Sequence, residues 1–218
     1  MIASAIAIVF ISATPLIAGS QDWAGAYVAV QGQSMGVELD GKYTDSDSVI
    51  TTGSGGKILS VAGGEIGYNI PLGDVFFISV GGTGLPGKAK ISEHDDAANN
   101  ADIKVEATDF WSVYLAPSIS LTDSSAIFIK YAENGADLTV TGDFTGSAST
   151  SLEGNSISMG TKTVFPSGMF VQSEAGLTEY DAIHVNDIGT AADDDSAKGD
   201  VKADPSIAFG AITIGYKF

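Results

Sequence analysis

The amino-acid sequence predicts an all-β fold, an eight-stranded antiparallel up-and-down transmembrane β-barrel. Eight segments alternate apolar residues with small or polar ones, which is the two-residue period of a β-strand. The connections between these segments are alternately short turns and long polar stretches. Barrels that cross a membrane have an even number of strands, with short turns at one end and long loops at the other.

The N-terminal segment predicts export. Residues 2–18 carry no charge and are almost wholly apolar, and small residues follow as far as Ser20. The apolar core is short and Pro15 interrupts it, which is typical of a secretory signal peptide. We therefore expect a signal peptide at residues 1–20, cleaved after Ala18 or Ser20, and a single barrel domain at residues 21–218. A short N-terminal anchor is the alternative.

The composition excludes several classes of function. The chain has no cysteine, which excludes disulfides, thiolate metal sites, a cysteine nucleophile and a lipoprotein anchor. All ten basic residues are lysines, and the net charge is -17 with a pI near 4.1. Such a field repels phosphates, so we expect no nucleic-acid partner.

The first four predicted strands cover residues 23–38, 57–70, 75–86 and 109–121. In the fourth, Trp111, Val113 and Leu115 share one face, and Ser112 and Tyr114 share the other. From residue 111 to residue 121 a strand tilted by about 45° rises ~23 Å, which matches the ~25 Å apolar band of membrane barrels.

Two features interrupt the alternation in these strands. Pro117 lies on the apolar face of the fourth strand, where it removes a hydrogen bond of the ladder. The third strand loses its alternation after Gly81. A β-bulge would accommodate either feature.

The last four predicted strands cover residues 127–132, 151–165, 171–177 and 205–218. Short turns follow the second, fourth and sixth strands, whereas long polar stretches follow the others. The stretch 142–154, rich in Ser, Thr and Gly, is predicted as a loop. Aromatic residues lie where the interfacial girdles of a barrel would form, with Trp23, Phe76, Phe165 and Phe218 near the turn end and Trp111 near the loop end.

The two ends of the barrel segment carry a family resemblance. The alternate residues Phe218, Tyr216, Ile214 and Ile212 form a one-sided apolar stripe. This stripe resembles the C-terminal signature that the barrel-assembly machinery reads in bacterial outer-membrane β-barrels. At the other end, the sequence Trp23-Ala24-Gly25-Ala26-Tyr27 resembles the Trp-x-Gly-x-Tyr start of many small barrels of this kind.

The chain thus resembles the small eight-stranded outer-membrane barrels, the group of the OmpA transmembrane domain, OmpX and the opacity-type, porin-like proteins. The resemblance implies a bacterial outer-membrane location with both termini periplasmic. It also implies contact with lipid and lipopolysaccharide, and we expect a monomer. The competing fold is a soluble secreted barrel of the lipocalin kind, which would have its apolar face inside.

Charged residues on the small-residue face predict a polar lumen. Glu65, Lys130, Lys162 and Glu174 all fall on the inward parity. Because buried charges persist only when they are paired, we expect these four side chains to form one network. The network is interpreted as a plug, and the alternative is a gate in a narrow porin-like channel.

The other candidate sites are weaker. Asp193, Asp194, Asp195 and Asp200 form an acidic run that a divalent cation would favour, but Lys198 stands where a calcium loop needs glycine. His94, in an acidic stretch, is interpreted as part of a solvated loop tip rather than a metal ligand. Lipid A deacylases of similar architecture use a His-x-Ser pair, whereas this chain has Asn186 two residues after His184.

The sequence therefore predicts a non-enzymatic integral outer-membrane protein without a cofactor. Its expected role is structural or in surface contact, through acidic loops that are able to hold divalent cations. A narrow channel and a barrel enzyme acting on lipid A remain the alternatives.

Overall fold

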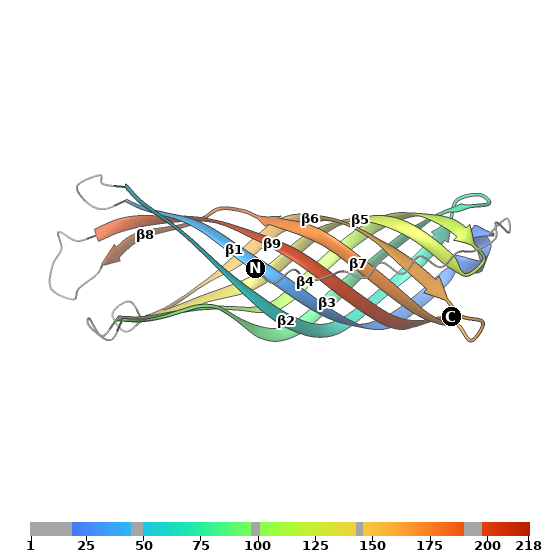
Figure 1. Ribbon diagram of the computed structural model, residues 1–218, viewed down its shortest axis with the longest axis horizontal. Coiled ribbons are helices and arrows are strands. Elements are labelled where there is room, and N and C mark those ends of the chain that lie inside the picture. Colours follow the sequence, from blue (N-terminus) through green and yellow to red (C-terminus); the bar gives the residue numbers. More distant parts are fainter. Residues whose placement is uncertain (1–18, 45–49, 97–100, 143–145, 190–197) are drawn as a thin grey trace, which may run out of the picture.

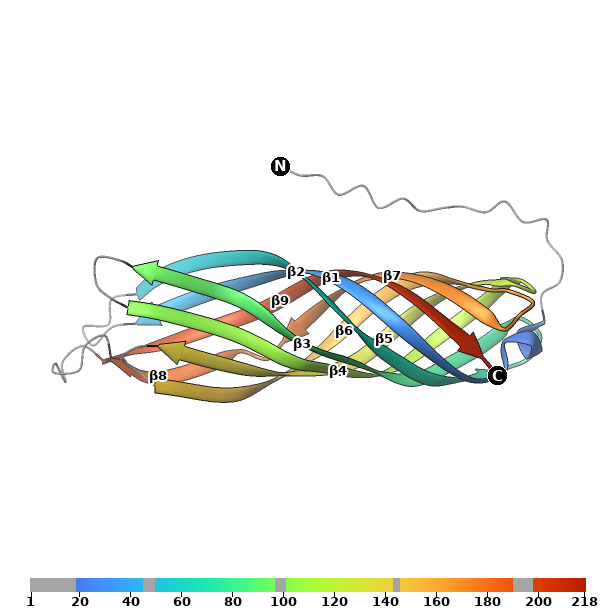
Figure 2. The same cartoon turned by 90° about the horizontal axis from the view of Figure 1, so that it is seen from below.

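In the computed structural model, residues 19–44, 50–96, 101–142, 146–189 and 198–218 are described, and they form one elongated barrel (Figures 1 and 2). The elements are η1 (Ser20–Trp23), β1 (Gly25–Thr44), β2 (Ile50–Pro71), β3 (Phe76–Asp96), β4 (Ala101–Thr122), β5 (Ser125–Gly142), β6 (Gly146–Val164), β7 (Met169–Tyr180), β8 (Ile183–Gly189) and β9 (Lys198–Lys217). Among these residues no helix is long and apolar enough to cross a membrane.

Neighbouring strands are antiparallel, and the barrel closes where β1 pairs with β9. The short strand β8 follows β7 and pairs with the same partner strand, β9. Two residues, Asp181 and Ala182, separate β7 from β8, so the two together occupy one position in the wall. The predicted eight-stranded antiparallel barrel is confirmed.

The strands are much longer than the alternating segments predicted. Except for β7 and β8, each has 18 to 22 residues. Twenty residues at ~3.3 Å per residue and a tilt near 45° rise ~47 Å, well beyond the ~25 Å apolar band of a membrane barrel. The prediction of a loop at residues 142–154 was wrong from Gly146 onward, because β6 begins there. Polar residues continue the strands outside the apolar band.

The irregular positions were only partly anticipated. At Pro117 the β4–β5 ladder skips two residues without any change of register, so the expected bulge is absent there. Beyond Gly81, strand β3 continues through register shifts between Leu85 and Lys88 and between Lys90 and Ser92. A further shift in β4 includes Asp109, whose φ of 54° lies in the left-handed region that Asp tolerates.

The apolar face of the strands near the turns points outward. On β4, Trp111, Val113 and Leu115 are between 44 and 51% exposed, whereas Tyr114 and Ala116, on the other face, are buried. Other exposed apolar residues of this outward face include Val28, Val30, Ile66, Tyr68, Phe76, Ile119, Leu121, Ile127, Ile129, Ile157, Met159, Leu177, Ile212 and Ile214. Because a water-soluble barrel has its apolar face inside, this part of the chain has the polarity of a transmembrane β-barrel.

Further from the turns the wall separates into two sheets. Pairing between β2 and β3 stops at Gly64 and Gly84, and pairing between β6 and β7 stops at Gly154 and Tyr180. Within the described ranges, β8 pairs with β9 and not with β6. One sheet therefore contains β8, β9, β1 and β2, and the other contains β3 to β6, and the two groups diverge toward the end opposite the C-terminus (Figure 1).

We call this two-sheet part the head, and the rest the spanning barrel. The head comprises residues 35–44, 50–61, 85–96, 101–110, 135–142, 146–153, 183–189 and 198–208. A buried apolar cluster lies in the head next to the spanning barrel, with Met35, Val37 and Ile207 from one sheet and Leu85, Phe110, Ala136, Leu138 and Leu152 among the contributions of the other. The head is thus a small β-sandwich that continues from a membrane-type barrel.

Candidate functional site

The interior of the spanning barrel is the candidate site. At the end with the short turns, η1 closes this interior. Trp23 has no exposed surface, and its ring stacks on Phe77 with centroids 5.2 Å apart. The indole nitrogen donates to Ser120 Oγ at 2.9 Å, and Asn69 Nδ2 donates to the Trp23 carbonyl at 2.8 Å. The prediction that Trp23 belongs to an outer girdle was wrong, because the turn of η1 directs the side chain into the lumen.

The middle of the lumen contains a buried ion pair. Lys130 Nζ lies 2.6 Å from Glu174 Oε2, and both residues are less than one-tenth exposed. Ser158 Oγ donates to the other carboxylate oxygen at 2.6 Å, and Gln172 Nε2 donates to Oε2 at 3.3 Å. The Lys130 ammonium also lies 4.4 Å from the centroid of the Tyr114 ring. Several partners therefore stabilise both charges away from bulk water.

Glu65 forms a second polar cluster across the lumen. The Tyr114 hydroxyl donates to Glu65 Oε1 at 2.6 Å, and it also hydrogen-bonds to the Tyr27 hydroxyl. The other carboxylate oxygen of Glu65 is buried and has no hydrogen-bond partner among the described residues. Glu65 is thus held by phenols rather than by a lysine.

Lys162 is held by aromatic rings. Its Nζ lies 4.1 Å from the centroid of Tyr27 and 4.4 Å from that of Phe170, and the residue is 5% exposed. Within the described ranges no ion pair joins Lys162 to a carboxylate. The structure places all four predicted lumen charges in the interior, but it joins only Lys130 and Glu174 directly.

Glycines make room for the large aromatic residues of this layer. Tyr27 lies directly opposite Gly67 in the β1–β2 register, and Tyr114 lies opposite Gly81 in the β3–β4 register. A Cβ on either glycine would overlap the tyrosine ring across from it. The inward glycines of the small-residue face therefore leave the space that the aromatic rings of the lumen occupy.

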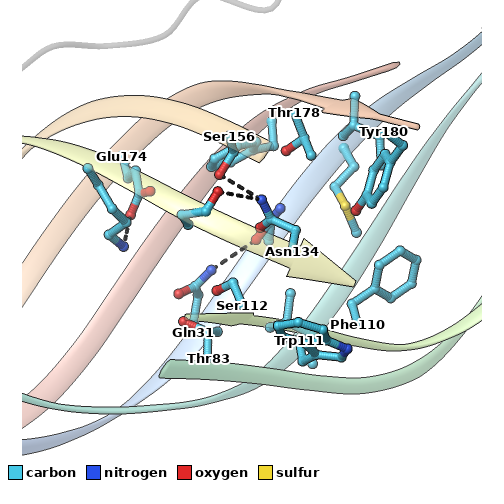
Figure 3. Close-up of a pocket in the computed structure, with 17 residues that line it drawn as sticks. Gln31, Thr83, Phe110, Trp111, Ser112, Asn134, Ser156, Glu174, Thr178 and Tyr180 are labelled. Atoms are coloured by element: carbon cyan, nitrogen blue, oxygen red, sulfur yellow. Dashed lines mark hydrogen bonds and ion pairs between the residues drawn. The ribbon is translucent and has the colours of Figure 1, made fainter. Parts of the chain in front are cut away.

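A cavity lies between this polar layer and the apolar core of the head (Figure 3). Its empty space, counted out to open solvent, is about 540 Å³. Its polar lining consists of Gln31, Gln33, Thr83, Ser112, Lys130, Asn134, Ser156, Glu174, Thr178 and Tyr180, and its apolar lining includes Met35, Leu85, Phe110, Ile207 and Phe209.

The predicted assembly signature lies on the outer surface at the closing strand. Phe218, Tyr216, Ile214 and Ile212 are between 44 and 70% exposed, and the rings of Phe218 and Tyr216 contact each other edge to face. The backbone N–H of Phe218 donates to the Ala26 carbonyl at 2.9 Å. The stripe is thus accessible from outside on the strand that closes the barrel.

For the remaining predicted sites the structure describes no side-chain arrangement. Asp193, Asp194 and Asp195 lie outside the described residues, and Asp200 belongs to β9 rather than to a loop. His94 lies in β3 and not at a loop tip, and His184 lies in β8 opposite Lys202; their side chains are also outside the description. Among the residues that the structure describes, no group of three His, Asp or Glu residues is placed to hold a metal ion.

Several functional residues were not singled out from the sequence. Tyr114 was only a position in an alternating pattern and Tyr27 only part of the start motif, although their side chains contact Glu65 and both lysines. Their pairing with glycines on neighbouring strands was a usable signal, but only once the register was known. The head core had a signal too, because the inward positions of β1 change from Gln31 and Gln33 to Met35 and Val37.

Comparison with known proteins gives similarity in architecture. No protein-family model and no curated protein sequence matches the chain. The outer-membrane protease OmpT from Escherichia coli aligns with a TM-score of 0.45 and 8% identity, over 89% of this chain and 97% of that one. Ail, the attachment invasion locus protein of Yersinia pestis, solved with the heparin analogue sucrose octasulfate, aligns with 0.41 and 9%, over 83% and 98%. Neisserial surface protein A aligns with 0.36 and 12%, over 86% and 97%.

Proposed function

We propose that the protein is an integral protein of a bacterial outer membrane that holds a β-sandwich head above the membrane for surface contact. One observation carries this proposal. On β5 the outward side chains change from Ile129 and Tyr131 to Asp137, while the inward ones change from Lys130 to Leu138. That double change is what a chain needs when one half is surrounded by lipid and the other by water.

The same surfaces support an orientation for the proposed barrel. The short turns, η1 and the exposed Phe218 stripe lie at one end, and the head lies at the other (Figures 1 and 2). We place the turn end in the periplasm, because short periplasmic turns are the rule in these barrels. In this proposal residues 1–20 serve as the export signal, the barrel-assembly machinery recognises the stripe, and lipid with lipopolysaccharide surrounds the monomeric barrel.

The proposed barrel is closed to solutes. Trp23 and Phe77 lie in its turn end, the ion pair and the tyrosines lie in its middle, and the apolar cluster lies above them at the start of the head. An eight-stranded barrel has an interior just wide enough for such side chains. We therefore favour the plug over the porin-like channel, and we assign no catalytic role to the lumen. Contact with divalent cations through the acidic segments stays part of the proposal.

Fractionation and conductance test the proposal. We expect the folded protein in the outer-membrane fraction, with a gel mobility that changes on heating, and we expect no discrete conductance steps in planar bilayers. A soluble fraction or the absence of a heat-dependent shift contradicts the membrane assignment. Conductance steps that change in Lys130→Met or Lys162→Met contradict the closed lumen and favour the channel. Lipid A that is modified by the native protein but not by His184→Ala favours the enzyme.

A further inference from the structure

We propose that the free edge of β2 in the head binds a basic, extended segment of another protein, which adds to the sheet as a further strand. Residues 58–63 are called the β2 edge. The proposal rests on the surface role above and names the kind of partner for it. Its support comes from the unpaired backbone, from an exposed apolar side chain and from the rim of the head core.

The backbone of the β2 edge is paired on one side only. Strand β2 pairs with β1 along its whole length, but with β3 only as far as Gly64. Beyond Gly64 the two sheets diverge (Figure 1), and within the described ranges no strand pairs with the other side of β2. A row of free backbone N–H and carbonyl groups is a template for a further strand.

The other described edges of the head have features that oppose such pairing. Strand β3 has Pro86, which has no N–H to donate, and two register shifts. Strand β8 has only seven residues and also a register shift, and the free part of β6 ends in the exposed Glu153. Proline, bulges, short strands and charges are the usual protection of sheet edges. The β2 edge contains no charge, no proline and no register shift, so it is the edge best suited to accept a strand.

Ile58 adds an apolar contact to this edge. It is 78% exposed, more than any other large apolar residue that the structure describes. No other large apolar side chain is exposed among those described in the head. Ile58 lies opposite Gly36 in the β1–β2 register, so no side chain of β1 covers it. A single exposed isoleucine is ordinary, but on an unpaired strand it offers a cross-strand contact to an incoming residue.

The inward face of the β2 edge is the rim of the head core. Leu59 and Val61 pack against the core but are only half-buried. On β1, which is paired on both sides, the inward residues Met35 and Val37 are buried. A strand added to β2 would cover Leu59 and Val61 with its own inward residues, so we expect those to be apolar.

The charge of the protein favours a basic partner. The net charge of -17 repels acidic segments. The exposed Glu38 lies opposite Gly56, on the same outward face as Ile58. Because Gly56 has no side chain, a lysine or arginine of an added strand has space to extend across it toward Glu38.

A second copy of this chain is a poorer partner. Copies in one membrane have the same orientation, so their β2 strands run the same way and cannot pair antiparallel. Each copy also carries the same negative charge. The observations therefore favour a strand from a different protein.

A synthetic peptide tests the proposal on the native protein in lipid nanodiscs. The probe is acetyl-Lys-Val-Thr-Val-Lys-Val-Thr-Val-Lys-amide, and hydrogen exchange is followed by mass spectrometry. At a peptide concentration about ten times the dissociation constant, we expect exchange along residues 58–63 to slow about tenfold. Exchange along residues 85–90 of β3 should not change. The same peptide N-methylated at every valine and threonine lacks most backbone donors and should give no protection.

Matched variants test the side chains. Ile58→Lys places a charge on the β2 edge, whereas Ser151→Lys places the same charge on the free edge of β6. Peptide affinity should fall about tenfold in the first variant and stay the same in the second. Glu38→Gln should weaken binding about threefold, and only for the lysine peptide and not for a peptide with glutamine in place of lysine. The heat-dependent gel shift should be retained in all three variants.

Four outcomes would overturn the proposal: no protection of residues 58–63, equal protection by the N-methylated peptide, protection of β3 or β6 instead, and pairing between copies. For the last, Ile58→Cys introduces the only thiol of the chain. Disulfide-linked dimers of this variant in vesicles would assign the β2 edge to a second copy. Fractionation and the gel shift report membrane insertion separately, so a correctly inserted protein that fails these tests contradicts the strand partner alone.

Discussion

The spanning barrel and the head are built from the same strands, but the apolar face of the strands points outward in the spanning barrel and inward in the head. On β5 the inward residues change from Lys130 to Leu138, while the outward ones change from Ile129 to Asp137. The strand keeps its two-residue alternation throughout, so only the identity of the two faces is exchanged. In the proposed arrangement, the exchange takes place where the surrounding medium changes from lipid to water.

The two regions also differ in how completely their strands pair. In the spanning barrel every strand is paired on both sides, because lipid offers no partner to a free backbone N–H or carbonyl group. In the head, water can satisfy the outer edges of β2, β3, β6 and β8, so the two sheets separate. Closure is thus obligatory in lipid and optional above it.

The largest effect should come from breaking the lumen ion pair. Lys130→Met leaves Glu174 buried without its cation, and we expect a loss of about 3–5 kcal/mol in the free energy of unfolding. Lys57→Met, which replaces an exposed lysine of the head, should change it by less than about 0.5 kcal/mol. Denaturant unfolding from lipid vesicles measures both. Adding Glu174→Gln to Lys130→Met should recover most of the loss, and failure to recover would mean that the pair is not the cause.

Truncation of the head core should have the next largest effect. Leu138 is buried in the apolar cluster, and Leu138→Ala should lower the free energy of unfolding by about 2–5 kcal/mol. The exposed Ser151→Ala on the facing strand is the control and should be nearly neutral. The same vesicle assay measures this pair. Equal stability of the two variants would show that the head interior is not a packed core.

A charge on the outward face distinguishes the two surroundings directly. Met159 and Ser151 both point outward on β6, one in the apolar band and one in the head. Met159→Lys should cost about 2–4 kcal/mol if it faces the bilayer midplane, whereas Ser151→Lys should cost almost nothing. Comparable values for the two lysines would contradict a membrane boundary between these positions.

Hydrogen exchange should reveal where the two sheets of the head separate, without changing the protein. We expect faster amide exchange along residues 50–63 of β2 and 85–96 of β3 than along residues 35–44 of β1, which is paired on both sides. Exchange followed by mass spectrometry in nanodiscs measures the difference. Uniform protection across these three segments would indicate that the head is a closed barrel as well.

Much of the spanning barrel could be predicted from the sequence, and little of the head. The turns after β2, β4 and β6 and the outward residues of β4 follow from local alternation and turn chemistry. Bulges such as the one at Asp109 reverse the parity of a strand, so alternation fades beyond them and the strands seemed to end. Polar outward residues in the head then looked like loops.

The candidate site shows the same division. Inward parity was enough to place Glu65, Lys130, Lys162 and Glu174 inside, because side-chain direction alternates with residue number wherever a strand has no bulge. Parity did not predict which groups each lysine contacts. Lys130 forms an ion pair with Glu174, whereas Lys162 lies over the rings of Tyr27 and Phe170. These contacts depend on register and barrel stagger, which no local pattern contains.

The sequence by itself determined that this is a β-protein with two chemically distinct faces, because a strand imposes a period of two on any chain that alternates. Only the tertiary structure decided which face is inside at each height, where pairing stops and which charges meet. These properties arise between strands that are distant in sequence, when a curved sheet closes on itself and brings its inward side chains into one small volume.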